Sequence, residues 1–107
     1  MSKIGFFVIF KTKPGKRDEV LSVWESFVKP HAEKNKSLEV SCYCFADNDP
    51  NTICLFELLT DEKELQKAMS SSWFKPYQKA LSPLLAGPPQ VISASPVWIK
   101  NDPDYCE

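Results

Sequence analysis

The chain has 107 residues, of which 43% are hydrophobic and 25% are charged. This length and composition are typical of one globular domain and exclude a disordered or fibrous chain. Thirteen basic and 14 acidic residues give a formal net charge of -1, so long-range attraction to phosphate backbones or anionic membranes is absent. We therefore expect neither nucleic acid nor a membrane as a partner.

The first predicted strand covers residues 4 to 12, which are rich in Phe, Val and Ile and precede a Lys-Pro-Gly turn. Its apolar run is far shorter than the ~20 residues that span a bilayer. It also lacks the small-residue cleavage site of a signal peptide. We therefore expect no transmembrane segment and a cytoplasmic protein, whose four cysteines are mostly reduced.

A first helix is predicted over residues 16 to 34, with Pro30 disturbing its last turns. Its apolar face is formed by side chains at helical spacing, namely Val20, Trp24, Phe27, Val28 and His31. Residues 38 to 46 and 52 to 59 then read as two strands joined by a polar turn. This pattern predicts a hairpin.

A second helix is predicted to begin at the capping sequence of residues 60 to 63. Pro76 and the serines before it break or kink this helix. Apolar side chains recur at helical spacing on both sides of the break, at Leu65, Ala68, Met69, Trp73, Tyr77, Ala80, Leu81, Leu84 and Leu85. A last strand is predicted over residues 91 to 100, with Pro96 favouring a sheet edge or a bulge.

The resulting order, β-α-β-β-α-β, predicts an α+β domain of the ferredoxin-like, split βαβ type. One antiparallel sheet would carry helices on one face, over residues 1 to 100, and a polar tail without a packing signal would follow at 101 to 107. Residues on both faces of the strands are apolar, as in the run from 4 to 10. A second copy that buries the open face explains this pattern, so we expect a homodimer.

Four short segments lie in order on these elements: Phe-Lys-Thr-Lys-Pro-Gly-Lys at 10 to 16, Asp-Pro-Asn-Thr at 49 to 52, Leu-Phe-Glu at 55 to 57 and Ser-Ser-Trp-Phe at 71 to 74. By their joint order and spacing, residues 4 to 99 resemble the antibiotic biosynthesis monooxygenase family. The resemblance implies a dimeric α/β barrel. It also implies a monooxygenase that acts with molecular oxygen on a small phenolic, quinol or polycyclic aromatic metabolite and uses no cofactor.

A non-catalytic alternative stays open, in which the dimer binds a small apolar ligand or acts as an interaction module. Many relatives carry His-x-x-Ser-x-His-Phe in the second helix, where this chain has Ala68 and Trp73 in place of the two histidines. This difference favours the alternative and also disfavours haem, which haem-degrading relatives bind through a helix-two histidine. Other relatives surround an aromatic substrate with Trp and Tyr, and the resemblance gives this role to Trp73 and Tyr77.

The predicted catalytic residues are Trp73, Tyr77 and His31. The indole and phenol groups would donate hydrogen bonds to a substrate oxygen, and the imidazole is a candidate base because histidine titrates near neutral pH. Structural alternatives are that His31 complements a helix dipole and that Trp73 packs in the core. The predicted substrate-binding residues are Met69, Trp73, Phe74, Tyr77, Tyr43 and Trp24.

Glu57 interrupts an apolar strand, where burial would raise its pKa and allow it to accept a proton. We expect it instead to pair with a cation or a backbone donor at the dimer interface. Cys42 and Cys44 should share one face of a strand, with Cys54 about opposite Cys44. Because a fourth ligand and Cys-x-x-Cys loops are missing, we expect buried, inert cysteines and no metal.

Overall fold

A computed structural model of the chain describes residues 2–105. Its elements are β1 (Ile4–Lys11), α1 (Arg17–Phe27), α2 (Lys29–Lys34), β2 (Leu38–Phe45), β3 (Thr52–Leu59), α3 (Glu62–Met69), α4 (Phe74–Leu81), η1 (Ser82–Leu84), β4 (Gln90–Ala94) and η2 (Pro103–Tyr105). The predicted β-α-β-β-α-β order is confirmed, with each predicted helix divided in two. None of the helices in the described residues is long and apolar enough to cross a membrane.

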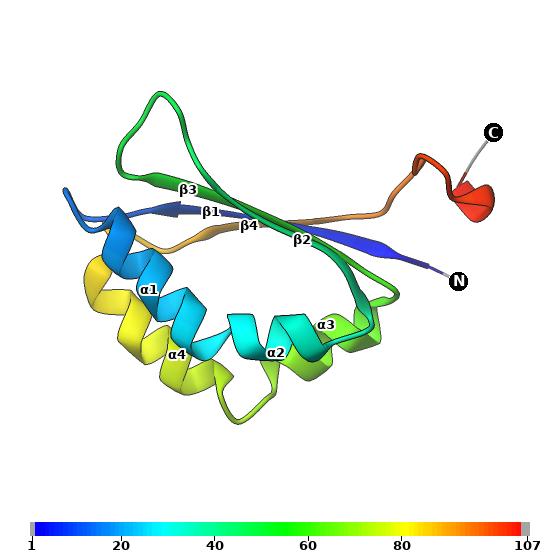
Figure 1. The fold of residues 1–107 in the computed structure, drawn as a ribbon, viewed down its shortest axis with the longest axis horizontal. Helices are drawn as coiled ribbons and strands as arrows, with labels where there is room; N and C mark the ends of the chain where they lie inside the picture. The colour runs from blue at the N-terminus through cyan, green and yellow to red at the C-terminus, as the bar shows by residue number, and fades with distance from the viewer. Residues whose placement is uncertain (1, 106–107) are drawn as a thin grey trace.

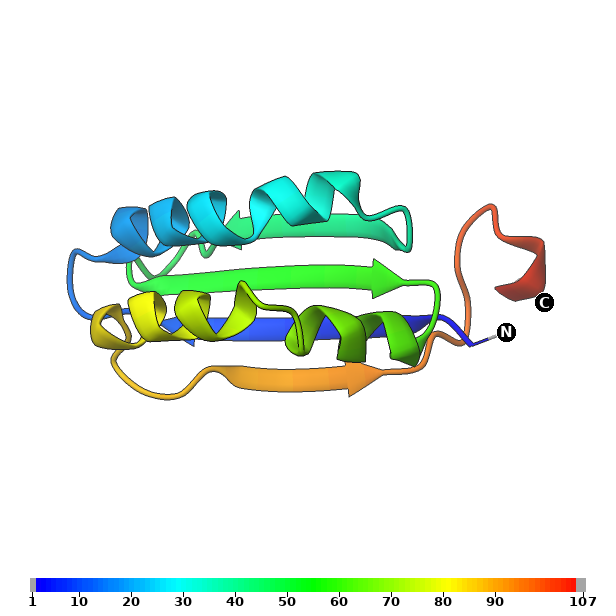
Figure 2. The ribbon, with the colours of Figure 1, turned by 90° about the horizontal axis from the view of Figure 1, so that it is seen from below.

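The four strands form one antiparallel sheet in the order β2-β3-β1-β4. All four α-helices cover the same face of this sheet, and the other face carries none of them (Figure 1). Figure 2 shows α1 and α2 running end to end over β2, while α3 and α4 run over β1. The predicted α+β architecture, with helices on one face of an antiparallel sheet, is therefore confirmed.

Both helix breaks follow from local chemistry. The Val28 backbone N–H still donates to the Trp24 carbonyl at 2.8 Å, as in a regular helix turn. The helix is interrupted just before Pro30, which has no N–H to continue the ladder and lies at the start of α2, where a missing N–H has no cost. Asp61 begins α3 by accepting a hydrogen bond from the Glu64 backbone N–H at 3.1 Å. The Ser70 hydroxyl donates to the Gln66 carbonyl at 2.8 Å near the end of the same helix.

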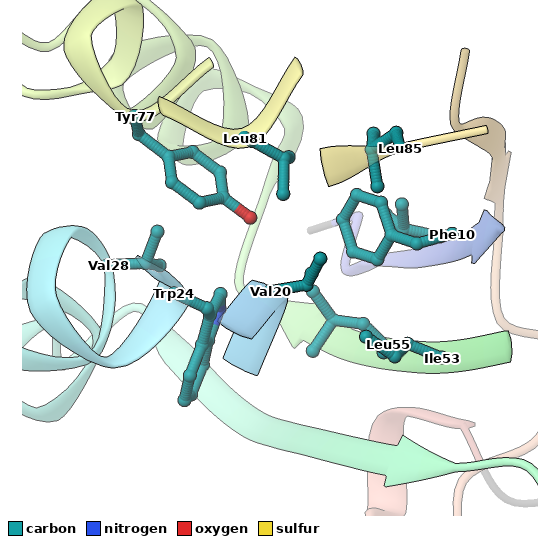
Figure 3. Close-up of a cluster of buried hydrophobic side chains, with 10 residues drawn as sticks. Phe10, Val20, Trp24, Val28, Ile53, Leu55, Tyr77, Leu81 and Leu85 are labelled. Atoms are coloured by element: carbon teal, nitrogen blue, oxygen red, sulfur yellow. The ribbon is translucent and has the colours of Figure 1, made fainter. Parts of the chain in front are cut away.

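The main core lies between the helices and the sheet. Val8 and Phe10 of β1 pack with Ile53 and Leu55 of β3 against side chains from α1, α4 and the segment after η1, as Figure 3 shows for most of them. The residues contributed by these helical segments are Val20, Trp24, Val28, Tyr77, Leu81 and Leu85. Ile53 and Val20 are both 0% exposed, so they mark the centre of the core.

The opposite face of the sheet is also apolar, as the strand sequences predicted. Phe7 of β1 is 42% exposed and Ile92 of β4 is 47% exposed, and the Phe7 and Phe56 rings are 4.8 Å apart. We call this surface the open face and define it by Phe7, Ile9, Val40, Cys42, Cys44, Cys54, Phe56 and Ile92, which the strand register places on the side away from the helices.

The cysteine arrangement was predicted correctly, but the predicted burial is wrong for this chain. Cys44 pairs with Cys54 across β2 and β3, and the Sγ atoms of Cys42 and Cys44 are 3.4 Å apart. All three thiols are exposed, and they lie on the open face, which carries none of the α-helices.

The last strand is shorter than predicted, ending at Ala94 rather than at residue 100. Pro96 follows, and proline has no N–H to continue the ladder. The tail from residue 101 also packs on the domain, against our prediction. The Lys3 ammonium pairs with Asp102 and Glu39 at 2.7 Å each, and the Lys3 backbone N–H donates to the Tyr105 hydroxyl at 2.7 Å. Residues 106 and 107 of this tail lie outside the described residues.

Candidate functional site

A cavity of about 310 Å³ lies between the helices and the helix-facing side of the sheet. Its sheet side is formed mainly by apolar residues of β1 and β3, namely Phe6, Val8, Phe10, Leu55 and Leu59. The helices contribute most of the opposite wall, with Trp24, Val28, His31, Ala32, Leu65, Ala68, Met69, Trp73, Phe74, Tyr77 and Leu81. This volume and this apolar lining are typical of a small-molecule site.

The two helix breaks shape the wall of the cavity. Trp73 is the residue before α4, and His31 lies in the last turn of α2. Their rings stack with centroids 4.8 Å apart and planes inclined by 10°. A flat aromatic pair therefore forms part of the wall, and Trp73 is half-buried beside the core rather than enclosed in it.

Tyr77 and Glu57 bring polar groups to this apolar space. The Tyr77 ring is buried and points from α4 toward α1 (Figure 3). Burial raises the pKa of the Tyr77 hydroxyl, and the negative charge of Glu57 raises it further, so the group is protonated and can donate a hydrogen bond. Glu57 faces the cavity from β3, across from the helices.

The position of Glu57 corrects our prediction of a dimer-interface residue. The alternation of β3 places it on the same face as Leu55 and Leu59, both of which line the cavity. No ion pair of Glu57 occurs within residues 2–105, and its hydrogen bond comes from the Ser41 hydroxyl at 3.4 Å. Burial raises the pKa of Glu57, and the weak Ser41 hydrogen bond opposes this effect.

Of the residues predicted for the site, Trp73, Tyr77, His31, Met69, Phe74 and Trp24 all line the cavity. Tyr43 does not line it but packs behind Trp24, with ring centroids 4.6 Å apart. Two further polar side chains, Asn35 and Gln78, line the cavity and were not predicted. Neither belongs to an apolar helical pattern, so periodicity gave no signal for them.

Two buried polar atoms have no hydrogen-bond partner among the described residues, the Trp24 indole nitrogen and the Tyr43 hydroxyl oxygen. Trp24 lines the cavity, so a bound molecule with an acceptor atom could satisfy its N–H. Tyr43 lies outside the cavity lining, and burial raises the pKa of its hydroxyl.

Because an unpaired buried hydroxyl costs free energy, Tyr43→Phe should stabilise the fold, by up to about 1–3 kcal/mol. Urea unfolding of the variant and the wild type measures this difference. Tyr105→Phe is the matched control, since its hydroxyl accepts the Lys3 N–H hydrogen bond and its loss should not stabilise. A Tyr43→Phe variant that unfolds more easily, or that loses ligand affinity, would show that the hydroxyl has a partner in solution.

The side chains of the described residues include no group of three or more His, Cys, Asp or Glu arranged to hold a metal ion. The three thiols of the open face lie on the other side of the sheet from the cavity. The prediction that the protein carries no cofactor stays a prediction, to be tested by elemental analysis and a visible absorption spectrum of the purified protein.

No family model matches the sequence, and no curated protein matches it. Solved structures do match the fold. A candidate antibiotic biosynthesis monooxygenase from Caulobacter crescentus is 19% identical with a TM-score of 0.80, covering 87% of this chain and 88% of that one. A second one, from Chloroflexus aurantiacus, is 17% identical with a TM-score of 0.75, covering 90% and 94%.

A Mycobacterium tuberculosis protein is 17% identical with a TM-score of 0.81, covering 94% of this chain and all of that one, 100%. At such low identities these likenesses show the fold alone. The resemblance inferred from sequence is therefore confirmed at the level of fold, which this chain shares with structures named as antibiotic biosynthesis monooxygenase candidates.

Proposed function

We propose that this protein binds a small planar phenol or quinol in the cavity and oxygenates it with molecular oxygen, using no cofactor. The apolar cavity whose wall includes the stacked His31 and Trp73 rings is the observation that carries this proposal. A flat ring buried there would gain dispersion and water release, while indole and phenol donors would orient its oxygen. The names of structures with the same fold support the reaction class.

The proposed chemistry begins with loss of a proton from the substrate, which makes its ring electron-rich enough to reduce oxygen. For a phenol with a methylene group between two rings, one oxygen atom becomes a ketone oxygen on that carbon, and the other leaves as water with the two methylene hydrogens. The protein's part is to exclude water, hold the ring and stabilise the substrate oxyanion through donors such as Tyr77 and Trp73. His31 lines the cavity beside Trp73, so its imidazole is a candidate group for this proton transfer.

We also propose that two copies associate through the open face in the cytoplasm. Phe7, Val40 and Ile92 are each exposed on this surface, and exposed apolar surface of this extent is uncommon on a monomer. Face-to-face packing of two sheets would bury these side chains together with the exposed thiols of Cys42 and Cys44. The helices and the cavity lie on the far side of each sheet, so the association leaves the cavity intact.

The test is oxygen uptake by the purified protein with anthrones, quinols and flavonoids. Trp73→Phe keeps most of the apolar area but removes the N–H donor, so kcat should fall by about 10²-fold while ligand affinity changes little. Trp98→Phe is the matched control, because Trp98 is 62% exposed and lies outside the cavity. Equal losses in both variants would contradict a role for the Trp73 indole.

The alternative function is passive binding of an apolar molecule. Ala68 and Trp73 line the cavity at the positions where many relatives have histidine, so the helices supply fewer proton-transfer groups than they do in those relatives. Ligand binding without oxygen uptake by any member of the screen would support this alternative and reject the oxygenase.

A further inference from the structure

Glu57 places a carboxylate in a cavity whose described lining contains no lysine or arginine. It lies near the end of β3, paired across the sheet with Phe6 on one side and Ser41 on the other. Its side chain faces the cavity together with those of Leu55 and Leu59. Among the residues that the structure describes, the hydrogen bond from Ser41 at 3.4 Å is at the limit of a useful interaction, and no cation pairs with the carboxylate.

A carboxylate in such a place costs folding free energy, since burial penalises its charged form. Above the ordinary carboxyl pKa the unfolded chain releases a proton that the folded protein, with its raised Glu57 pKa, still holds. Stability therefore falls as pH rises from the ordinary value to the raised one, and the loss is complete above both. A carboxylate without a cation partner in an apolar cavity does not serve the fold, so binding chemistry is the better explanation for Glu57.

The charges around the cavity restrict which ligands can bind next to Glu57. Within residues 2–105 no lysine or arginine lines the cavity, so an anionic ligand would find a repelling carboxylate and no counter-charge. The other titratable groups in the lining are His31 of α2 and Tyr77 of α4, while β1, α1, α3 and β4 contribute none. A neutral ligand with a hydroxyl donor satisfies the free carboxylate oxygen and suits the apolar walls.

We propose that Glu57 is the proton acceptor of this cavity and that it selects an uncharged ligand with an acidic hydroxyl group over carboxylates and phosphates. This inference rests on the proposed function. In the step, the ligand O–H bond breaks, the proton forms an O–H bond with a Glu57 carboxylate oxygen, and the electron pair stays on the ligand as a phenolate. The phenolate then accepts a hydrogen bond from a donor such as the Tyr77 hydroxyl.

The first test compares the wild type with Glu57→Gln, which has the same shape and no acidity, in oxygen uptake with a hydroxylated anthrone between pH 5 and 9. We expect turnover to fall by about 10²–10⁴-fold and its rise on the acidic side of the pH profile to disappear. Glu33→Gln, an exposed residue of α2 outside the cavity lining, is the control and should change neither. The Glu57→Gln melting temperature at pH 7 should equal or exceed that of the wild type.

Two further variants keep the assignment testable. Ser41→Ala removes the hydrogen bond that favours the charged carboxylate, so the rise of turnover on the acidic side of the pH profile should move to higher pH. His31→Gln separates the two candidate acceptors. If the acidic rise of turnover survives in Glu57→Gln and is lost in His31→Gln, His31 is the proton acceptor and the inference is overturned.

The second test measures binding without turnover, by quenching of tryptophan fluorescence with 2-naphthol, 2-methoxynaphthalene and 2-naphthoate. The wild type should prefer naphthol over the ether by at least about tenfold, because a hydrogen bond to a charged group is lost in the ether. It should bind naphthoate weakest, and Glu57→Gln should remove most of both preferences. Absence of naphthol binding, or preferences that Glu57→Gln leaves unchanged, would overturn the inference.

The two tests distinguish failure of the proposed oxygenase from failure of the Glu57 inference. If no compound supports oxygen uptake but naphthol selection depends on Glu57, the oxygenase proposal is rejected and the acceptor role in ligand binding stands. If oxygen uptake occurs and Glu57→Gln leaves its rate and pH profile unchanged, the oxygenase stands and the Glu57 inference is rejected.

Discussion

Replacing Phe7 by glutamate should convert the proposed dimer to a monomer. Phe7 lies on β1 in the middle of the open face, 42% exposed and in contact with Phe56. In a face-to-face dimer the new carboxylate would be buried without a partner, and breaking complementarity in this way costs several kcal/mol. We expect the dissociation constant to rise at least about 100-fold, measured by sedimentation at micromolar concentration.

In a monomer the same glutamate would lie in solvent, so the fold itself should survive the substitution. Ser22→Glu adds the same charge on the exposed surface of α1 and is the matched control, expected to remain dimeric. Wild-type protein that sediments only as a ~12 kDa species, in line with the 12.2 kDa chain, would reject the dimer and leave the open face without an explanation.

Local patterns predicted most of the fold because periodicity and turn residues determine it. The apolar spacing that begins at Val20, the Asp61 cap and the polar turn before Thr52 each produced the predicted element. The last strand was predicted too long because Val97 and Trp98 are apolar, although Pro96 had already ended the ladder. Both side chains are exposed in the described chain, which composition alone does not reveal.

The candidate site was harder to predict because it depends on contacts between distant elements. Helical spacing placed Trp73, Tyr77 and Met69 together, but the stack of His31 on Trp73 joins two helical segments far apart in the sequence, which spacing within one helix does not predict. Glu57 was assigned to the wrong face of the sheet, although strict alternation from Leu55 places it toward the helices. The ion pair between Lys3 and Asp102 was not predicted, because a single lysine and a distant aspartate form no recognisable sequence pattern.

Replacing Ile53, at the centre of the core, by alanine should lower the stability of the fold strongly. Ile53 is 0% exposed and packs between the sheet and α1, and it does not line the cavity. Removing three carbon atoms leaves a space that the neighbours fill only in part, so the free energy of unfolding should fall by about 2–5 kcal/mol. For a domain of this size that corresponds to a drop in melting temperature of roughly 10–30 °C, measured by calorimetry.

The matched control is Ile92→Ala, the same substitution on the open face, where the side chain is 47% exposed. Both substitutions should be made in the Phe7→Glu background, because Ile92 would be buried in a dimer and its loss would then also weaken association. In the monomer Ile92→Ala should cost less than about 1 kcal/mol, since little buried volume is lost. Similar costs for the two variants would mean that Ile92 is covered even in the monomer, or that the core is not centred on Ile53.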